Sequence, residues 1–209
     1  MSGQALFQYR HRAGTPHSYV VYGDRPLELL PEPIAGKRFL DVGCGNGFWA
    51  GRLRALGATV VGLDGAANGI AIARAEHPEV RFEERFATEA LLAELGEEPF
   101  DGIISIEVVE HLYDPRGFMR GCVAALKPGG TIVLTTPYHG YLKNLAISLA
   151  DKWDDHMNPL WDGGHLKLWS RASLTRLLAE AGLTDMKFRG MGRVPFLWKG
   201  MAISGRKPA

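Results

Sequence analysis

The sequence predicts an α/β fold in which a mainly parallel sheet is covered by helices on both faces. Three observations predict it: short runs rich in Val, Ile and Leu, longer amphipathic stretches that alternate with them from about Arg38 onward, and Gly or Pro residues where most of these stretches end. Strands that are apolar throughout are typical of sheets buried on both faces, and their alternation with helices is typical of parallel pairing.

Four strands and three helices are expected in the first half of the chain. The strands are expected at residues 38–42, 59–63, 80–84 and 102–106, and the helices at 47–56, 66–76 and 88–95. Gly57, Pro78 and Gly96 follow these helices closely. Glycine adopts the left-handed conformation that ends many helices, and proline cannot continue a helix, so these residues mark the helix ends.

The second half of the chain interrupts the alternation with a long insertion, residues 138–164. Around it, helices are expected at 116–126 and 170–181, the latter with Ser170 as its N-cap, and strands at 131–135, 186–190 and 196–204. The first half of the insertion, residues 141–153, is expected to be helical. Loops of this length in compact domains are usually functional, so a small lid is expected here.

Length and charge limit the classes of protein that the chain can represent. Its 209 residues fit a single domain, 1–209, in which residues 1–25 are expected to form an N-terminal flap or tail. The formal net charge of +1 disfavours a nucleic-acid partner. The sequence shows neither a signal peptide nor an apolar span of 18 residues, which predicts a cytoplasmic protein. Cys44 and Cys122 lie in unrelated contexts and predict no disulfide or zinc site.

A glycine-rich loop follows the first expected strand, in the segment FLDVGCGNG. Gly43, Gly45 and Gly47 let the backbone approach a ligand and direct amides of the next helix toward it. A dinucleotide fingerprint requires glycine where this chain has Phe48, so a pyrophosphate ligand is disfavoured. Asp41, within the strand, is expected either to order the loop by accepting hydrogen bonds from its amides or to meet a ligand ammonium group.

An acidic residue, Asp64, ends the next strand in the segment VVGLD. A carboxylate at this position can accept hydrogen bonds from both hydroxyls of a ribose. The alternative is an ordinary glycine turn followed by an N-capping aspartate. The order and separation of the two features favour a ligand that carries a ribose and an amino acid moiety.

Four segments together resemble the motifs of class I S-adenosylmethionine-dependent methyltransferases: LDVGCGNG, VVGLD, FDGIISIE and LKPGG, within residues 39–136. The resemblance implies a Rossmann-like seven-stranded sheet whose last strand is antiparallel, with S-adenosylmethionine bound across the strand ends. The implied donor site consists of Asp41, Gly43, Cys44, Gly45 and Gly47 near the methionine moiety, Asp64 at the ribose, Gly65, Ala66 and Ala87 near adenine, and Ile106 at the methionine end of the pocket.

A cluster of acidic and histidine residues follows the fourth expected strand, in IEVVEHLYDP. If this segment is helical, Glu107, Glu110 and His111 lie on one face and suit a divalent cation, with His165 as a further ligand. A metal ion would hold an acceptor hydroxyl in line with the methyl group and lower its pKa. Without a metal, His111 or His165 is expected to act as the general base. The alternative is a histidine that caps a turn or packs beneath the donor.

The segment EVVEH resembles the corresponding segment of ubiquinone-biosynthesis O-methyltransferases and of small-RNA 2′-O-methyltransferases. The resemblance implies that Glu107, Glu110, His111 and His165 bind Mg²⁺, Mn²⁺, Zn²⁺ or Fe²⁺. TPYHGYLKNLAISLADKW and GGHLKLWSRASLTRLLAEAG extend the likeness to the ubiquinone type. The N-terminus and the segment DDHMNPLWDGGH differ from that type, which leaves the substrate open.

Large aromatic residues lie within the insertion and just after it, among them Trp153, Trp161 and Trp169. They predict either a lid that holds an aromatic or lipid-like acceptor or the packing of a lid helix onto the sheet. Lys143 and Lys152 add the prediction of weak peripheral contact with a membrane.

The predicted function is O-methylation of a small hydroxylated acceptor, either catechol-like or another vicinal diol, with Glu110, His111 and His165 as the catalytic residues. Three alternatives stay open: metal-independent N- or C-methylation of a natural-product intermediate, RNA 2′-O-methylation, and a donor-binding protein without catalysis. The acceptor and the oligomeric state are not encoded in any motif.

Overall fold

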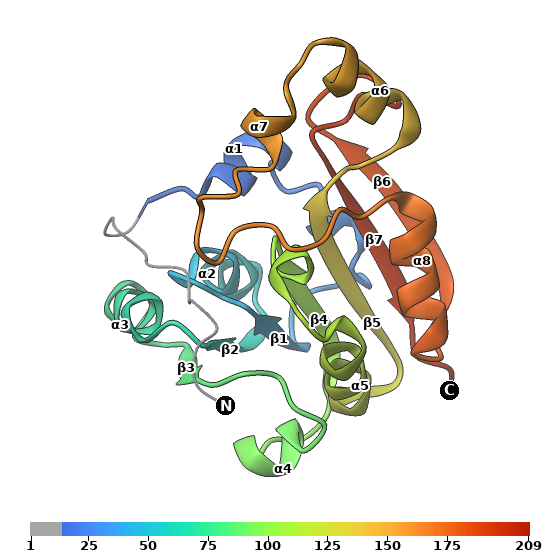
Figure 1. Cartoon of the computed structure of the whole chain (residues 1–209). Helices are drawn as coiled ribbons and strands as arrows, with labels where there is room; N and C mark the ends of the chain where they lie inside the picture. Colours follow the sequence, from blue (N-terminus) through green and yellow to red (C-terminus); the bar gives the residue numbers. More distant parts are fainter. Residues whose placement is uncertain (1–13) are drawn as a thin grey trace.

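The computed structural model describes residues 14–209, which form one seven-stranded sheet with helices on both faces (Figure 1). The strand order is β3-β2-β1-β4-β5-β7-β6. Neighbouring strands from β3 to β5 are parallel, whereas β7 is antiparallel to both β5 and β6. The predicted fold class is therefore confirmed, including the antiparallel last strand.

Five of the seven strands lie within two residues of the expected ranges, whereas β5 begins five residues earlier than predicted and β7 begins later. The strands are β1 (Arg38–Val42), β2 (Thr59–Asp64), β3 (Arg81–Glu84), β4 (Phe100–Ile106), β5 (Leu126–Pro137), β6 (Thr184–Met191) and β7 (Gly200–Arg206). The last strand begins four residues later than predicted, because residues 192–199 form the connection from β6. Phe196 in this connection has a left-handed φ of 67°, which a regular strand does not allow.

The helices differ more from the expected ranges. They are α1 (His17–Tyr22), α2 (Phe48–Ala55), α3 (Ala67–Glu76), α4 (Leu91–Leu95), α5 (Pro115–Ala125), α6 (Tyr141–Leu149), α7 (Trp153–His156) and α8 (Arg171–Glu180), with short 3₁₀ turns η1 (Leu27–Leu29) and η2 (Val109–His111). The single helix expected at 141–153 is divided in two at Asp151, whose φ is 52°. Ser170 caps α8 as predicted, accepting a hydrogen bond from the Ser173 amide.

Two apolar clusters lie on opposite faces of the sheet. One contains side chains of α4, α5 and α8, such as Leu91, Met119 and Leu178, and the other contains side chains of α1, α2 and α3, such as Leu53 and Ile70. The neighbouring residues Ile103 and Ile104 of β4 are both fully buried, one in each cluster. Burial on both faces explains why the strands are apolar throughout rather than alternating.

The N-terminal part of the described chain contains a helix that the sequence analysis missed. α1 has only six residues and no apolar periodicity, so local pattern carried no signal for it. Its Tyr19 ring lies 4.9 Å from Phe48 and 5.7 Å from Trp49, measured between ring centroids, which attaches α1 to α2. The flap or tail expected at 1–25 also includes residues 1–13, which lie outside the described residues.

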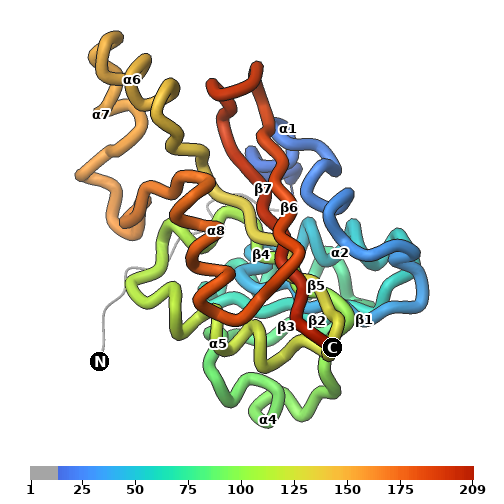
Figure 2. Tube along the Cα trace, turned by 90° about the vertical axis from the view of Figure 1, so that its right-hand side faces the viewer, coloured from blue at the N-terminus to red at the C-terminus, as the bar shows by residue number. Residues whose placement is uncertain are grey.

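The insertion extends from one end of the sheet. Figure 2 shows α6 and α7 projecting from the same end of the molecule as the connection between β6 and β7. The chain between α7 and α8 then returns toward β4 (Figure 1). No helix in residues 14–209 combines the length and the apolar character that crossing a membrane requires.

Candidate active site

The glycine loop after β1 adopts a conformation that favours glycine at three positions. Gly43, Gly45 and Gly47 have φ values of 79°, 54° and 82°. A Cβ atom on Gly43 would lie 2.3 Å from Cγ2 of Val108, so the loop approaches the segment after β4 closely. The amides of Gly43 and Cys44 both donate to the Leu63 carbonyl, at 2.7 and 2.8 Å, which holds the loop against the end of β2.

Asp64, at the end of β2, orders both the glycine loop and its own turn. Its Oδ2 accepts a hydrogen bond from the Gly45 amide at 2.9 Å, and its Oδ1 accepts one from the Ala66 amide at 2.7 Å. Burial raises the pKa of the Asp64 carboxyl, whereas these two amides lower it. Asp64 thus makes the loop contact that the sequence analysis considered for Asp41.

Asp41 is buried without a hydrogen-bond partner among the described residues. Only 1% of its surface is exposed, and both of its carboxylate oxygens lack a partner there. Burial and then the neighbouring Asp64 charge raise the pKa of Asp41 to about 8. A buried carboxylate of this kind suits a cationic ligand group nearby, because the Ala50 backbone, which lowers the pKa, offsets only part of the cost of lost hydration.

A cavity of about 1000 Å³ extends along this end of the sheet. Seven residues of the expected donor site line it: Gly43, Cys44, Gly45, Asp64, Gly65, Ala87 and Ile106. Asp41, Gly47 and Ala66 do not line it. Gly47 instead is the N-cap residue of α2. A Cβ atom on Gly47 would lie 2.9 Å from the Cβ atom of Ala73.

The cavity wall also contains residues that no motif indicated, Phe86 among them. Phe86 covers Gly65, since a Cβ atom on that glycine would lie 2.4 Å from the Phe86 ring, and more than half of the Phe86 side chain is exposed. Pro16, His17 and Ser18 reach the cavity from the N-terminal segment. A lone aromatic residue two positions after β3 was the available signal for Phe86, and residues 16–18 belong to the N-terminal flap or tail expected at 1–25.

The segment after β4 is not the helix on which the predicted cluster depended. Only Val109–His111 forms a 3₁₀ turn, and Glu107 has a left-handed φ of 57°. The Glu107 amide donates to Thr135 Oγ1 at 3.0 Å, and the same hydroxyl donates to Glu107 Oε1 at 2.9 Å. Hydrogen bonding to β5 therefore replaces the expected helical geometry at Glu107.

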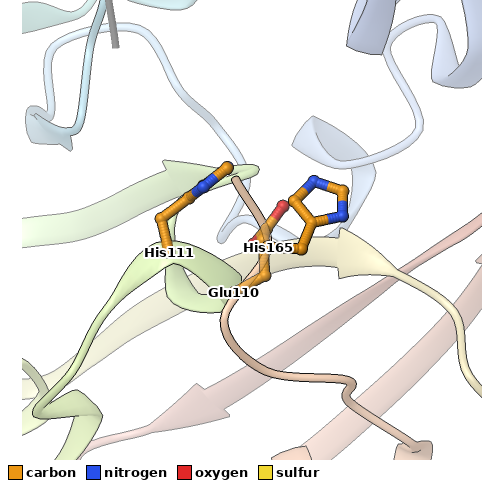
Figure 3. A group of neighbouring side chains, drawn as sticks. All are labelled: Glu110, His111 and His165. Atoms are coloured by element: carbon orange, nitrogen blue, oxygen red, sulfur yellow. The ribbon is translucent and has the colours of Figure 1, made fainter. Parts of the chain in front are cut away.

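Glu110, His111 and His165 come together at the wall of the cavity. One potential ligand atom from each lies within 4.8 Å of the others (Figure 3). The group joins the turn after β4 to the segment before α8. His111 and His165 line the cavity, while Glu110 is 1% exposed behind them.

Backbone hydrogen bonds bring His165 to this position. The Glu110 carbonyl accepts from the Leu166 amide at 2.8 Å and from the Lys167 amide at 3.1 Å. The Trp169 indole donates to the Val109 carbonyl at 3.3 Å. These bonds fix the end of the insertion to the 3₁₀ turn and so place His165 beside Glu110 and His111.

The polar atoms of the group suit a divalent cation. Both carboxylate oxygens of Glu110 lack a hydrogen-bond partner within residues 14–209. His111 Nδ1 lies 2.8 Å from the Gly163 carbonyl and 3.1 Å from that of Gly164, so Nδ1 carries the hydrogen and Nε2 the lone pair of the neutral ring. Burial, followed by the His111 charge, lowers the pKa of His165 to about 4, which keeps its ring neutral.

The two glutamates of the segment are both buried acids. Burial raises the pKa of Glu110 well above its usual value, and the Glu107 charge raises it further. Burial likewise raises the pKa of Glu107 to about 7, although Thr135 and Tyr22 act in the opposite direction. A carboxylate that is costly to ionise without a partner is stabilised by a nearby cation.

The sequence matches the family described as "Methyltransferase domain" over residues 10–187. The chain belongs to this family. Its curated relatives include ubiquinone biosynthesis O-methyltransferases of Dinoroseobacter shibae, 36% identical over 77% of this chain and 65% of that protein, and of Cereibacter sphaeroides, 35% identical over 84% and 71%. The predicted membership in the S-adenosylmethionine-dependent methyltransferases, with a likeness to the ubiquinone type, is thereby confirmed.

Solved structures support the fold of this methyltransferase. A putative methyltransferase of Bacillus halodurans has a TM-score of 0.67 at 15% identity, covering 88% of this chain and 98% of that one. A putative methyltransferase of Haloferax volcanii, in complex with a methyltransferase activator, has a TM-score of 0.66 at 19% identity, with 90% and 89% covered. A phosphoethanolamine N-methyltransferase of Haemonchus contortus, solved in complex with S-adenosylmethionine, has a TM-score of 0.63 at 16% identity, with 92% and 55% covered. At these identities the matches concern the fold alone.

Proposed function

We propose that this methyltransferase transfers a methyl group from S-adenosylmethionine to a hydroxyl oxygen of a small acceptor that carries two neighbouring hydroxyls, such as a catechol. The observation that carries the proposal is the position of Glu110, His111 and His165. This group lies at the same cavity whose wall includes the glycine loop and Asp64. Donor and acceptor sites would thus share one cavity.

Three features support the proposed donor site: the glycine loop, Asp64 and Asp41. The left-handed glycines leave room for a ligand against the backbone, and no phosphate-binding pattern is present. Each oxygen of Asp64 accepts one amide and keeps a second lone pair, with which it would accept a ribose hydroxyl. Asp41, buried and unpartnered among the described residues, would stabilise the donor ammonium group.

The acceptor end is proposed to hold a divalent cation through Glu110, His111 and His165. Carboxylate and imidazole ligands together suit Mn²⁺, Zn²⁺ or Fe²⁺ better than Mg²⁺. When bound, the ion would lower the pKa of the acceptor hydroxyl. Glu110 supplies charge, and the hydrogen bonds from His111 to the two glycine carbonyls orient its ring.

The reaction is an in-line displacement in which the acceptor oxygen forms a bond to the methyl carbon as the bond from that carbon to sulfur breaks. Sulfur retains the electron pair and leaves as the thioether of S-adenosylhomocysteine. With an ion bound, the lowered pKa of the acceptor hydroxyl would let its proton pass to solvent. Without an ion, the neutral ring of His165, which lines the cavity, would accept the proton.

The names of the curated relatives support transfer to oxygen rather than to nitrogen or carbon. The formal net charge of +1 does not favour RNA as the acceptor. Turnover with any acceptor would exclude a purely donor-binding protein.

The experiment that tests the proposal combines binding and turnover. S-adenosylhomocysteine binding is measured by calorimetry with EDTA and with Mn²⁺, Zn²⁺ or Mg²⁺, and methyl transfer is assayed on catechols. Failure to bind S-adenosylhomocysteine contradicts the donor site. Binding without methyl transfer to any vicinal diol contradicts the acceptor class.

Glu110→Gln and Glu107→Gln form a matched pair for the cation. We expect Glu110→Gln to lose Mn²⁺, measured by metal analysis after gel filtration, because its oxygens belong to the group. Glu107→Gln is expected to retain it, because the Glu107 carboxylate is hydrogen bonded to Thr135. Equal loss from both variants would favour the four-ligand arrangement that the sequence analysis predicted.

A further inference from the structure

A second, smaller cavity adjoins the proposed acceptor site. It has a volume of about 210 Å³ and is lined by His156, Met157, Asn158, Pro159, Trp161 and His165. Two of these residues, Trp161 and His165, also line the large cavity. These two side chains therefore separate the cavities.

Trp161 also contacts the group that is proposed to position the acceptor. Its ring centroid lies 5.8 Å from that of His111 and 5.4 Å from that of His165. Of the two residues that line both cavities, His165 belongs to the polar group. Trp161 takes part in no proposed chemical step. Its indole forms an apolar wall beside the position proposed for the acceptor hydroxyls.

Backbone hydrogen bonds on both sides of Trp161 order the turn that carries the indole. The Trp161 amide donates to the Asn158 carbonyl at 3.2 Å, and the Gly164 amide donates to the Trp161 carbonyl at 2.9 Å. A Cβ atom on Gly164 would lie 2.8 Å from the Trp161 carbonyl oxygen and 3.1 Å from the indole, so a side chain there would displace the turn. The hydrogen bonds from His111 to Gly163 and Gly164 attach the turn to the polar group.

The small cavity offers an apolar interior. Besides His165 of the polar group, its polar side chains are His156 and Asn158, and both form hydrogen bonds within the insertion: Asn158 Oδ1 accepts from the Leu160 amide and His156 Nδ1 donates to the Lys152 carbonyl. Met157, Pro159 and Trp161 supply the remaining surface. An apolar substituent would be accommodated there if the indole were smaller.

We propose that Trp161 is a specificity-determining residue that limits acceptor size by closing the acceptor site against the small cavity. The inference rests on the proposed O-methyl transfer and specifies which acceptors that site admits. The acceptors favoured by the native chain are compact vicinal diols. Acceptors with an apolar branch directed at Trp161 are excluded.

The test compares catechol with catechols that carry a tert-butyl group at position 3 or 4. Dissociation constants are measured by calorimetry in the presence of S-adenosylhomocysteine and Mn²⁺, and kcat/KM is measured with S-adenosylmethionine. In Trp161→Ala we expect the preference for a bulky catechol over catechol to rise at least about tenfold, the scale on which a pocket discriminates small apolar groups. Trp161→Phe is expected to lie between this variant and the native chain.

Leu160→Ala is the matched control, because Leu160 lies in the same turn, is 89% exposed and lines neither cavity. It is expected to leave the preference unchanged. An unchanged preference in both Trp161 variants, with S-adenosylhomocysteine affinity retained, overturns the inference, as does the absence of any catechol binding by the native chain. Catechol binding without turnover overturns only the proposed function. If Trp161→Ala does not fold, the direction of the shift in Trp161→Phe decides.

Discussion

Two aspartates on neighbouring strands, Asp41 and Asp64, differ in the partners of their carboxylates. Asp64 accepts two backbone amides, whereas Asp41 has no hydrogen-bond partner among the described residues. Burial and the Asp64 charge raise the pKa of Asp41 to about 8, so this carboxyl gains and loses its proton near neutral pH. The donor-free protein accordingly keeps a proton on Asp41 that the unfolded chain, with an ordinary pKa of about 3.9, has lost.

Asp41→Asn is therefore expected to change how stability depends on pH. Between about pH 4 and pH 8 the native state binds more protons at this site than the unfolded state, so the free energy of unfolding falls as pH rises. Asn removes this contribution, and the variant should gain stability relative to the native chain by at most about 1.4 kcal/mol per pH unit. Urea unfolding of donor-free protein at pH 5 and pH 8 measures it. Parallel pH profiles for the two proteins would refute the assigned protonation.

At the scale of the element, the glycine loop and the turn after β4 depend on each other's shape. Gly43 leaves the space that Val108 occupies, and the left-handed Glu107 begins the turn that carries Glu110 and His111. A side chain on the loop would displace that turn. The donor loop and the acceptor group are thus joined through a contact between two backbone segments.

Gly43→Ala is expected to destabilise the protein more than Gly96→Ala. Both glycines have left-handed backbones, with φ of 79° and 64°, and alanine in that conformation costs about 1–2 kcal/mol. Gly96 has open space around it, whereas a Cβ atom on Gly43 would meet Val108, which adds about 1–3 kcal/mol. Gly43→Ala should also weaken S-adenosylhomocysteine binding. Unfolding and calorimetry test both effects, and equal destabilisation by the two changes would be inconsistent with the close contact.

At the scale of the whole molecule, the group of Glu110, His111 and His165 joins segments more than fifty residues apart. The hydrogen bonds between the segment at 163–169 and the turn at 109–111 hold them together. A cation bound by all three side chains would bind the native state and not the unfolded chain, in which these segments are separated. Its binding should therefore stabilise the entire fold.

Mn²⁺ at about 100 times its dissociation constant is expected to raise the free energy of unfolding by about 2.7 kcal/mol. For a chain of this size, that increase corresponds to a rise in Tm of about 5–10 °C. Differential scanning calorimetry of the EDTA-treated protein provides the measurement. His165→Ala should show little or no increase at the same concentration, since it lacks one of the three ligands. An equal increase in both proteins would mean that Mn²⁺ binds elsewhere.

Local sequence determined the central sheet and the nature of the donor loop. Apolar runs, helix-ending glycines and the Ser170 cap act within a few residues, so β1 and α8 follow from the chain itself. The same holds for the loop of Gly43, Gly45 and Gly47, because its left-handed backbone is accessible chiefly to glycine. These features also carry the methyltransferase family resemblance.

Tertiary structure decided the geometry of the acceptor group. The predicted cluster depended on a helical turn after β4, which is not present, because Glu107 pairs with Thr135 on β5 instead. His165 reaches Glu110 only through hydrogen bonds across the insertion. Both are contacts between residues distant in sequence, and their energies depend on burial and orientation that no local pattern encodes. The chain's own pattern therefore determined the sheet and the donor loop, whereas packing between distant segments determined which acids and histidines meet.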